Sequence, residues 1–161
     1  MTDNKSSAKR RLPVVQPKAE DEAEPRPAWH WVGFGAVAIF VAWLPLAWLA
    51  EAIGRRLVAG KVAGGEAALA ELSRSERLSA LAMIALPQAV ALALASAGGG
   101  FLVTRFGTGT KARDAAFAGA CVGLLALGLT FASAGFSLAA FIVPLLATAF
   151  AALGGRLGLR R

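Results

Sequence analysis

Charged residues are missing from three long stretches of the chain. No Asp, Glu, Lys or Arg occurs from Pro27 to Ala50, from Leu78 to Thr104, or from Ala115 to Gly155. These windows hold 24, 27 and 41 residues. An α-helix rises ~1.5 Å per residue and the hydrocarbon core of a bilayer is ~30 Å thick, so about 20 apolar residues cross it. The first two windows therefore each predict one transmembrane helix.

The third window is too long for a single crossing. As one helix it would measure ~60 Å, about twice the thickness of the hydrocarbon core. Small and polar residues gather at Ser133-Ala134-Gly135-Phe136-Ser137, where we expect the chain to turn back. The sequence therefore predicts an all-α integral membrane protein, a small bundle of four transmembrane helices over about residues 29–53, 79–103, 115–132 and 136–153.

Composition supports the membrane over the alternative of a soluble helical bundle. Apolar residues other than glycine make up 57% of the chain, and the 18 glycines come on top of that. A typical soluble domain holds ~45–50% apolar residues with glycine included. A soluble fold of 161 residues has too little interior to hide this excess.

The two ends of the chain differ in character from this transmembrane domain, which we place at residues 29–155. Residues 1–28 carry six basic and five acidic residues, and we expect a disordered cytoplasmic tail because such a segment buries too little apolar surface to fold. Residues 156–161 form a short basic C-terminal tail. The cluster Lys9-Arg10-Arg11 is either a docking arm or lipid-binding patch, or part of a solubilising tail that fixes topology. We favour the solubilising tail and expect no nucleic-acid partner.

Lys and Arg residues predict how the helices sit in the membrane. With four crossings, the N-terminus, the second loop and the C-terminus share one side, which carries 12 of the 17 basic residues. The first loop carries the other five. Basic residues near helix ends stay in the cytoplasm, so both termini are predicted to be cytoplasmic. The alanine- and arginine-rich composition is typical of a bacterium with GC-rich DNA, which would place the chain in the inner membrane.

The glycine-rich stretch from Gly98 to Asp114 is either a phosphate-binding loop or a turn between two membrane helices. A phosphate-binding loop needs Gly-Lys-Ser/Thr after a buried strand. Here Thr110 precedes Lys111 and Ala112 follows it, so nucleotide binding is disfavoured. The stretch instead predicts a short basic turn between the second and third helices. Gly107 and Gly109 supply conformations with positive φ, and Asp114 favours the positive end of the third helix.

Small residues at helical spacing mark candidate packing faces. The second helix has a row of alanines four residues apart, and the third has a Gly-x-x-x-Gly motif. Such small residues let helices approach closely in lipid. Such spacings are common in an alanine-rich chain, so packing within one bundle is our default and self-association into a homo-oligomer is the alternative. The candidates are Ala85, Ala89, Ala93, Ala97, Gly119 and Gly123.

The first loop contains one clear helix signal. Ser73-Arg74-Ser75-Glu76 matches a capping box and predicts that the second helix begins outside the membrane. Residues 66–72 predict a short helix of their own. Glu51 and Arg55 have the spacing of an i,i+4 ion pair at the end of the first helix.

Chemically active groups are sparse within the apolar runs. Gln88 is the intramembrane polar candidate, and we expect it to bond a carbonyl freed by Pro87 or one on a neighbouring helix. Cys121 is expected to lie at depth in the third apolar run, where a buried thiol is unreactive. His30, the only histidine, has no second metal ligand, and no cofactor is expected. The interfacial anchors are predicted to be Trp29, Trp31, Trp48 and Arg105.

These features favour a small non-catalytic membrane protein, an accessory or structural subunit that binds lipids and other membrane proteins. No base, nucleophile or metal site suggests an enzyme. The alternative is a minimal transporter or channel for a small uncharged solute, acting as an oligomer, because ion-coupled transport needs an ionisable group at depth.

The orientation can be tested by labelling single-cysteine variants in intact and opened cells, in a chain whose Cys121 is replaced by Ala. A cysteine at position 3 is expected to react only after the membrane is opened, whereas one at position 61 reacts in intact cells. The opposite pattern would reverse the predicted topology.

Overall fold

The computed structural model describes residues 27–62, 72–134 and 138–160. In these residues the chain forms α1 (Ala28–Ala59), α2 (Arg74–Phe106), α3 (Ala112–Ala134), the short 3₁₀ helix η2 (Leu138–Phe141) and α4 (Ile142–Leu159). Each of the four α-helices is long and apolar enough to cross a membrane. The predicted fold class is therefore confirmed: the chain is an all-helical, four-span membrane protein.

The helices extend beyond the apolar windows from which they were predicted. α1 and α2 contain 32 and 33 residues, or ~50 Å each, and so exceed the ~30 Å hydrocarbon core. α4 starts later than expected, at Ile142, and continues to Leu159. The predicted reversal at 133–137 falls where α3 ends, although residues 135–137 lie outside the described residues. The short helix predicted over 66–72 also lies almost entirely outside them.

Local signals explain where α1 ends and α2 begins. The capping box is confirmed, because the Ser73 hydroxyl accepts the Glu76 backbone N–H and the Glu76 carboxylate accepts the Ser73 backbone N–H. The predicted ion pair between Glu51 and Arg55 is present on α1. Gly60 follows α1 as its C-cap.

The turn between α2 and α3 is tight, and its two glycines act differently. Gly109 has φ of 72°, the left-handed conformation that was predicted. Gly107 has φ of −75°, so the prediction of a positive φ was wrong there. A side chain at Gly107 would instead overlap the Val103 carbonyl, which also accepts the Thr110 hydroxyl at 2.9 Å. Asp114 accepts the Lys111 backbone N–H at 2.7 Å at the start of α3.

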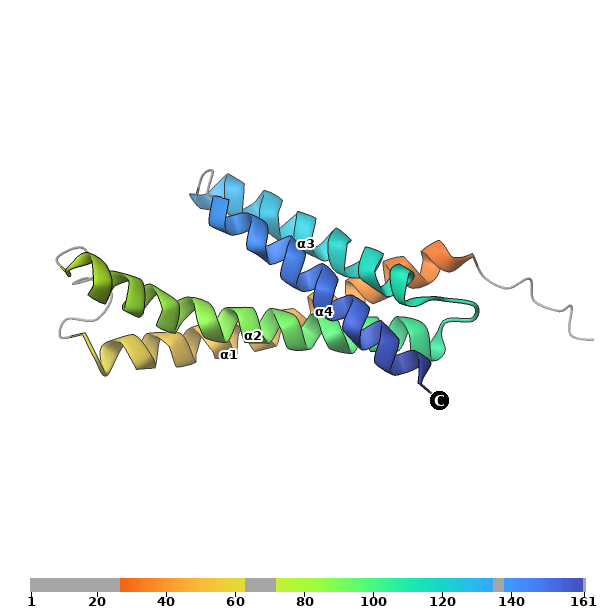
Figure 1. The fold of residues 1–161 in the computed structure, drawn as a ribbon, viewed down its shortest axis with the longest axis horizontal. Helices are drawn as coiled ribbons and strands as arrows, with labels where there is room; N and C mark the ends of the chain where they lie inside the picture. Colours follow the sequence, from red (N-terminus) through yellow and green to blue (C-terminus); the bar gives the residue numbers. More distant parts are fainter. Residues whose placement is uncertain (1–26, 63–71, 135–137, 161) are drawn as a thin grey trace, which may run out of the picture.

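The helices form two antiparallel hairpins, α1–α2 and α3–α4 (Figure 1). The hairpins cross at the end where α1 and α3 begin and α2 and α4 finish, which we call the closed end. They diverge toward the opposite end, the open end, where α1–α2 also reaches further than α3–α4 (Figure 1). α2 packs against both α1 and α4, and α4 packs against both α2 and α3.

Small residues on α4 make the closest helix contacts. A methyl group at Gly154 would overlap the backbone of Ala97 on α2, and one at Gly119 on α3 would overlap the backbone of Ala147. In the same way Gly100 lies against the backbone of Ala151. The buried residues of α4 are all small: Ala147, Ala151, Gly154, Gly155 and Gly158. α4 therefore lies in a seam between α2 and α3 in which backbone meets backbone.

Glycines also bring α1 close to α2. Gly35 lies against Val103, Gly99 against Ile39, and Gly54 against the backbone of Ile84. Two of the three consecutive glycines of α2, Gly99 and Gly100, thus face different neighbours, whereas Gly98 has nothing within 4 Å of where its side chain would be. Because lipid is as apolar as these side chains, close van der Waals contact is the main source of helix association here.

Large apolar side chains lie mainly on the outside of the bundle. Leu145 is 70% exposed and Leu86 is 63% exposed, whereas the buried core consists largely of alanine with a few larger residues such as Ile39 and Val103. Soluble proteins rarely expose continuous apolar surface of this kind. The arrangement fits a protein whose outer surface is covered by acyl chains.

Adding one methyl group at Gly98 or at Gly100, which lie two residues apart on α2, is expected to have opposite effects on stability. Gly100→Ala should lower the free energy of unfolding by about 1–3 kcal/mol, because the Ala151 backbone has no rotamer by which to move aside. Gly98→Ala is the matched control and should raise it by about 0.5–1 kcal/mol, since alanine favours a helix and its methyl group meets nothing. Unfolding followed by circular dichroism in detergent measures both, and equal effects would contradict the packing at Gly100.

Candidate functional site

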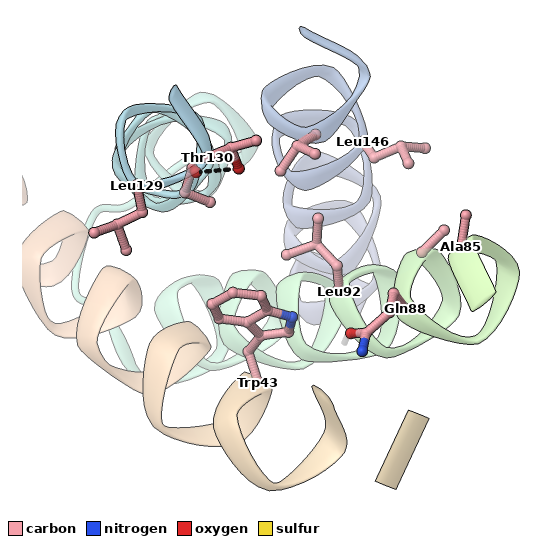
Figure 2. Close-up of a pocket in the computed structure, with 10 residues that line it drawn as sticks. Trp43, Ala85, Gln88, Leu92, Leu129, Thr130 and Leu146 are labelled. Carbon is pink, nitrogen blue, oxygen red and sulfur yellow. Dashed lines mark hydrogen bonds between the residues drawn. The ribbon is translucent and has the colours of Figure 1, made fainter. Parts of the chain in front are cut away.

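A cleft separates the two hairpins on the open side of their crossing. It has a volume of about 400 Å³ and is bordered by all four helices (Figure 2). Its walls are mostly aliphatic, with one aromatic and two polar side chains. The lining residues are Trp43, Ala85, Gln88, Ala89, Leu92, Ala126, Leu129, Thr130, Val143 and Leu146.

The alanine row of α2 leads from the seam into this cleft. Ala97 lies at the closed end of the row, in contact with Gly154. Ala93 is half-buried one turn further on. Ala89 and Ala85 line the cleft, where α4 has moved away from α2. One face of α2 thus packs against α4 near the closed end and lines the cleft further along.

The two glycines of the Gly-x-x-x-Gly motif lie in the α3–α4 contact. Gly119 packs on Ala147 and Ala151, and Gly123 packs on Pro144. This contact holds the second hairpin together beside the cleft. In the described residues these glycines face their own hairpin partner.

Gln88 ties α1 to α2 at the edge of the cleft. Its Nε2 donates to the backbone carbonyl of Ala47 on α1 at 3.1 Å. Of the two partners considered from the sequence, the carbonyl on a neighbouring helix is the one observed. Because one amide hydrogen of Gln88 is used in this bond, only its other amide hydrogen and its amide oxygen remain for a ligand in the cleft.

Trp43 and Thr130 are the other side chains with polar atoms at the cleft. The indole of Trp43 extends from α1 toward Leu92, with its nitrogen on the side of Gln88 (Figure 2). Thr130 donates to the carbonyl of Ala126 in its own helix at 2.8 Å (Figure 2). The hydroxyl is therefore engaged within α3, and the polar groups that face the cleft are a neutral indole and part of a neutral amide.

The chemistry of the lining limits what the cleft can hold. None of its ten residues is ionisable. In the described part of the chain no group of three or more His, Cys, Asp or Glu side chains is placed to hold a metal ion. An apolar surface with two neutral hydrogen-bonding groups suits an apolar helix, an acyl chain or a small uncharged molecule.

Two structural features of the bundle were missed in the sequence. The first is the small-residue face of α4, whose signal was the spacing of Ala147, Ala151, Gly154 and Gly158. The second is Thr104, which is buried and donates to the Gly155 carbonyl of α4 at 2.8 Å. Its position at the end of the charge-free run, next to Arg105, gave no signal of burial.

The side chains predicted as interfacial anchors lie at different depths in the bundle. Trp29 is 67% exposed and stacks on His30, with ring centroids 3.7 Å apart. Trp48 is 74% exposed, and Arg105 is exposed at the end of α2. Trp31 instead packs half-buried against the core.

Cys121 lies within a membrane-spanning helix but faces outward from the bundle. Cys121 is exposed on α3, because the seam with α4 takes up the face that carries Gly119 and Gly123. Cys121 lines a shallow groove with residues of α1, including Val37 and Phe40.

Comparison with known proteins identifies no relative. No protein-family model matches the chain, and neither the curated proteins nor the solved structures include a significant match. What the protein does must therefore be inferred from its own geometry, which is that of a four-span membrane protein with a cleft between two helical hairpins.

Proposed function

We propose that the protein is a non-catalytic subunit of a membrane complex and that its cleft receives one transmembrane helix of another membrane protein. The observation that carries the proposal is the divergence of the two hairpins on one side of a close-packed seam (Figure 1). A partner helix in this space would cover apolar side chains from both hairpins.

The walls of the cleft suit a helix better than a charged solute. Ala85, Ala89 and Ala126 are small, and small residues allow the backbone of another helix to come close in lipid. Leu129 is 56% exposed and Leu146 is half-buried, so both remain available for side-chain contact. Trp43 offers an indole N–H, which can bond to a backbone carbonyl or a side chain of the partner.

Carriage of a small uncharged solute is the second candidate function. The arrangement that favours it is a cleft open on one side of the bundle and closed on the other by α2 and α4, as in one state of an alternating-access carrier. The engagement of Gln88 with Ala47 and of Thr130 with Ala126 leaves few groups for solute recognition, so we rank it second.

The cellular setting belongs to the same proposal. We place the protein in a bacterial inner membrane with both termini in the cytoplasm, so that the cleft opens toward the opposite side. The support is the 12 basic residues on the side of the termini, against five in the first loop.

A photo-crosslinking residue at position 129 tests the subunit proposal in native membranes. Because Leu129 lines the cleft, we expect a crosslinked species whose added mass belongs to a different membrane protein. Ala89→Phe should abolish the crosslink by filling the cleft. Ala42→Phe is the matched control, since Ala42 is exposed on α1 and is not among the lining residues, and should leave the crosslink intact.

Two outcomes would contradict the subunit proposal. One is a crosslinked species of twice the mass of the chain, which would show a second copy in the cleft. The other is a chain that crosslinks to no protein, purifies alone and moves a solute across vesicles in an Ala89-dependent way, which would favour the carrier.

A further inference from the structure

A second groove lies at the closed end of the bundle, between the beginning of α1 and the end of α2. It has a volume of about 420 Å³ and is lined by His30, Trp31, Phe34, Leu102 and Phe106. Phe34 is 53% exposed and Phe106 is 62% exposed, so the groove opens on the outer surface of the bundle rather than toward the cleft. Four of its five lining residues are mainly apolar, and the fifth is His30.

Arg105 lies next to this groove, and four other basic residues belong to the same end of the bundle. Arg105 follows Leu102 by three residues and directly precedes Phe106, which places it on the same side of α2 at the edge of the groove. The backbone of Arg105 lies beside Gly158 of α4, and Arg156 and Arg160 flank that glycine. Lys111 follows in the turn to α3, and Arg113 lies in the first turn of α3.

Carboxylates are few among the described residues of the closed end. Among the described residues there, Asp114 is the single carboxylate. It accepts the backbone N–H of Lys111 at 2.7 Å and lies 3.8 Å from Nε of Arg113. The described residues of this end therefore carry five basic side chains and one carboxylate, which is itself hydrogen-bonded within the turn.

Depth in the membrane narrows the choice of ligand. The groove is at the point where the charge-free part of α2 ends at Thr104 and the charged turn begins. The exposed, stacked pair of Trp29 and His30 lies beside it, as expected for side chains at the headgroup level. A ligand that fits must join an apolar chain to an anionic group at this level.

We propose that this groove binds an anionic phospholipid, with one acyl chain against Trp31, Phe34, Leu102 and Phe106 and the phosphate among Arg105 and its basic neighbours. Basic pockets between membrane helices recognise anionic headgroups in this manner. The proposal is independent of the partner helix in the cleft, because the two sites share no lining residue.

Quenching of tryptophan fluorescence by brominated lipids tests the proposal. The parent chain carries Trp43→Phe and Trp48→Phe. The remaining reporters are Trp31, which lines the groove, and Trp29, which stacks on the lining residue His30. We reconstitute the parent chain with brominated phosphatidylglycerol or brominated phosphatidylcholine at equal amounts. Phosphatidylglycerol is expected to quench more strongly, and competition between the two lipids gives their relative affinity.

Loss of one basic residue at the groove should reduce the preference for phosphatidylglycerol. Arg105→Gln is expected to lower it about fivefold, the effect of one basic side chain near an anionic membrane surface. Lys111→Gln, a second variant in case Arg105 is needed for folding, should lower it less. Arg74→Gln is the matched control at the open end and should leave the preference unchanged, with helicity of all variants checked by circular dichroism.

Equal quenching by the two lipids in the parent would overturn the proposal. So would an equal loss of preference in Arg105→Gln and Arg74→Gln, which would show only the general attraction of a basic protein for anionic membranes.

Discussion

The structure depends on direct contact between the backbones of α2, α3 and α4. In lipid, burying a leucine between helices gains little, since the acyl chains are equally apolar. What distinguishes a packed helix pair from two helices in lipid is how many atoms come within van der Waals range, and this favours residues with no side chain beyond Cβ. α4 presents such residues on two adjacent faces, with Gly154 against α2 and Ala147 against Gly119 of α3. The hydrogen bond from Thr104 to Gly155 is formed at the same seam, where the carbonyl is close enough to accept it.

The shape of the bundle follows from where these contacts lie. They are concentrated between residues 97–104 of α2 and 151–158 of α4, near the closed end. Further along, α2 still carries alanines but α4 turns away, and Gln88 bonds back to α1 instead. The same helix face therefore forms the seam at one end and the wall of the cleft at the other. The closed end also collects the basic residues that end α2 and α4, so the two proposed sites differ in chemistry as well as position.

Four helices could be predicted because the thickness of a bilayer sets how many uncharged residues are needed to cross it. The start of α2 could be predicted because Ser73 and Glu76 form a capping box, which depends only on neighbouring residues. The packing faces were harder to predict. In a chain so rich in alanine, the row from Ala85 to Ala97 is no more conspicuous than the row of small residues on α4, and only the crossing angle decides which of them touch. The burial of Thr104 and the exposure of Cys121 have the same cause, because both depend on which side of a helix meets its neighbour. The cleft arises from the divergence of two hairpins, and no local pattern of residues encodes that angle.

The central claim is that the hairpins are joined at one end and apart at the other, and spin-label distances in lipid nanodiscs test it most directly. After replacement of Cys121, one pair of labels is placed at Phe106 and Leu159, near the seam, and another at Leu86 and Ile142, beside the cleft; all four side chains are exposed. The account predicts a longer mean distance for the second pair than for the first. Equal distances would mean that α2 and α4 run side by side along their whole length, and this would contradict both the seam at one end and the cleft beyond it.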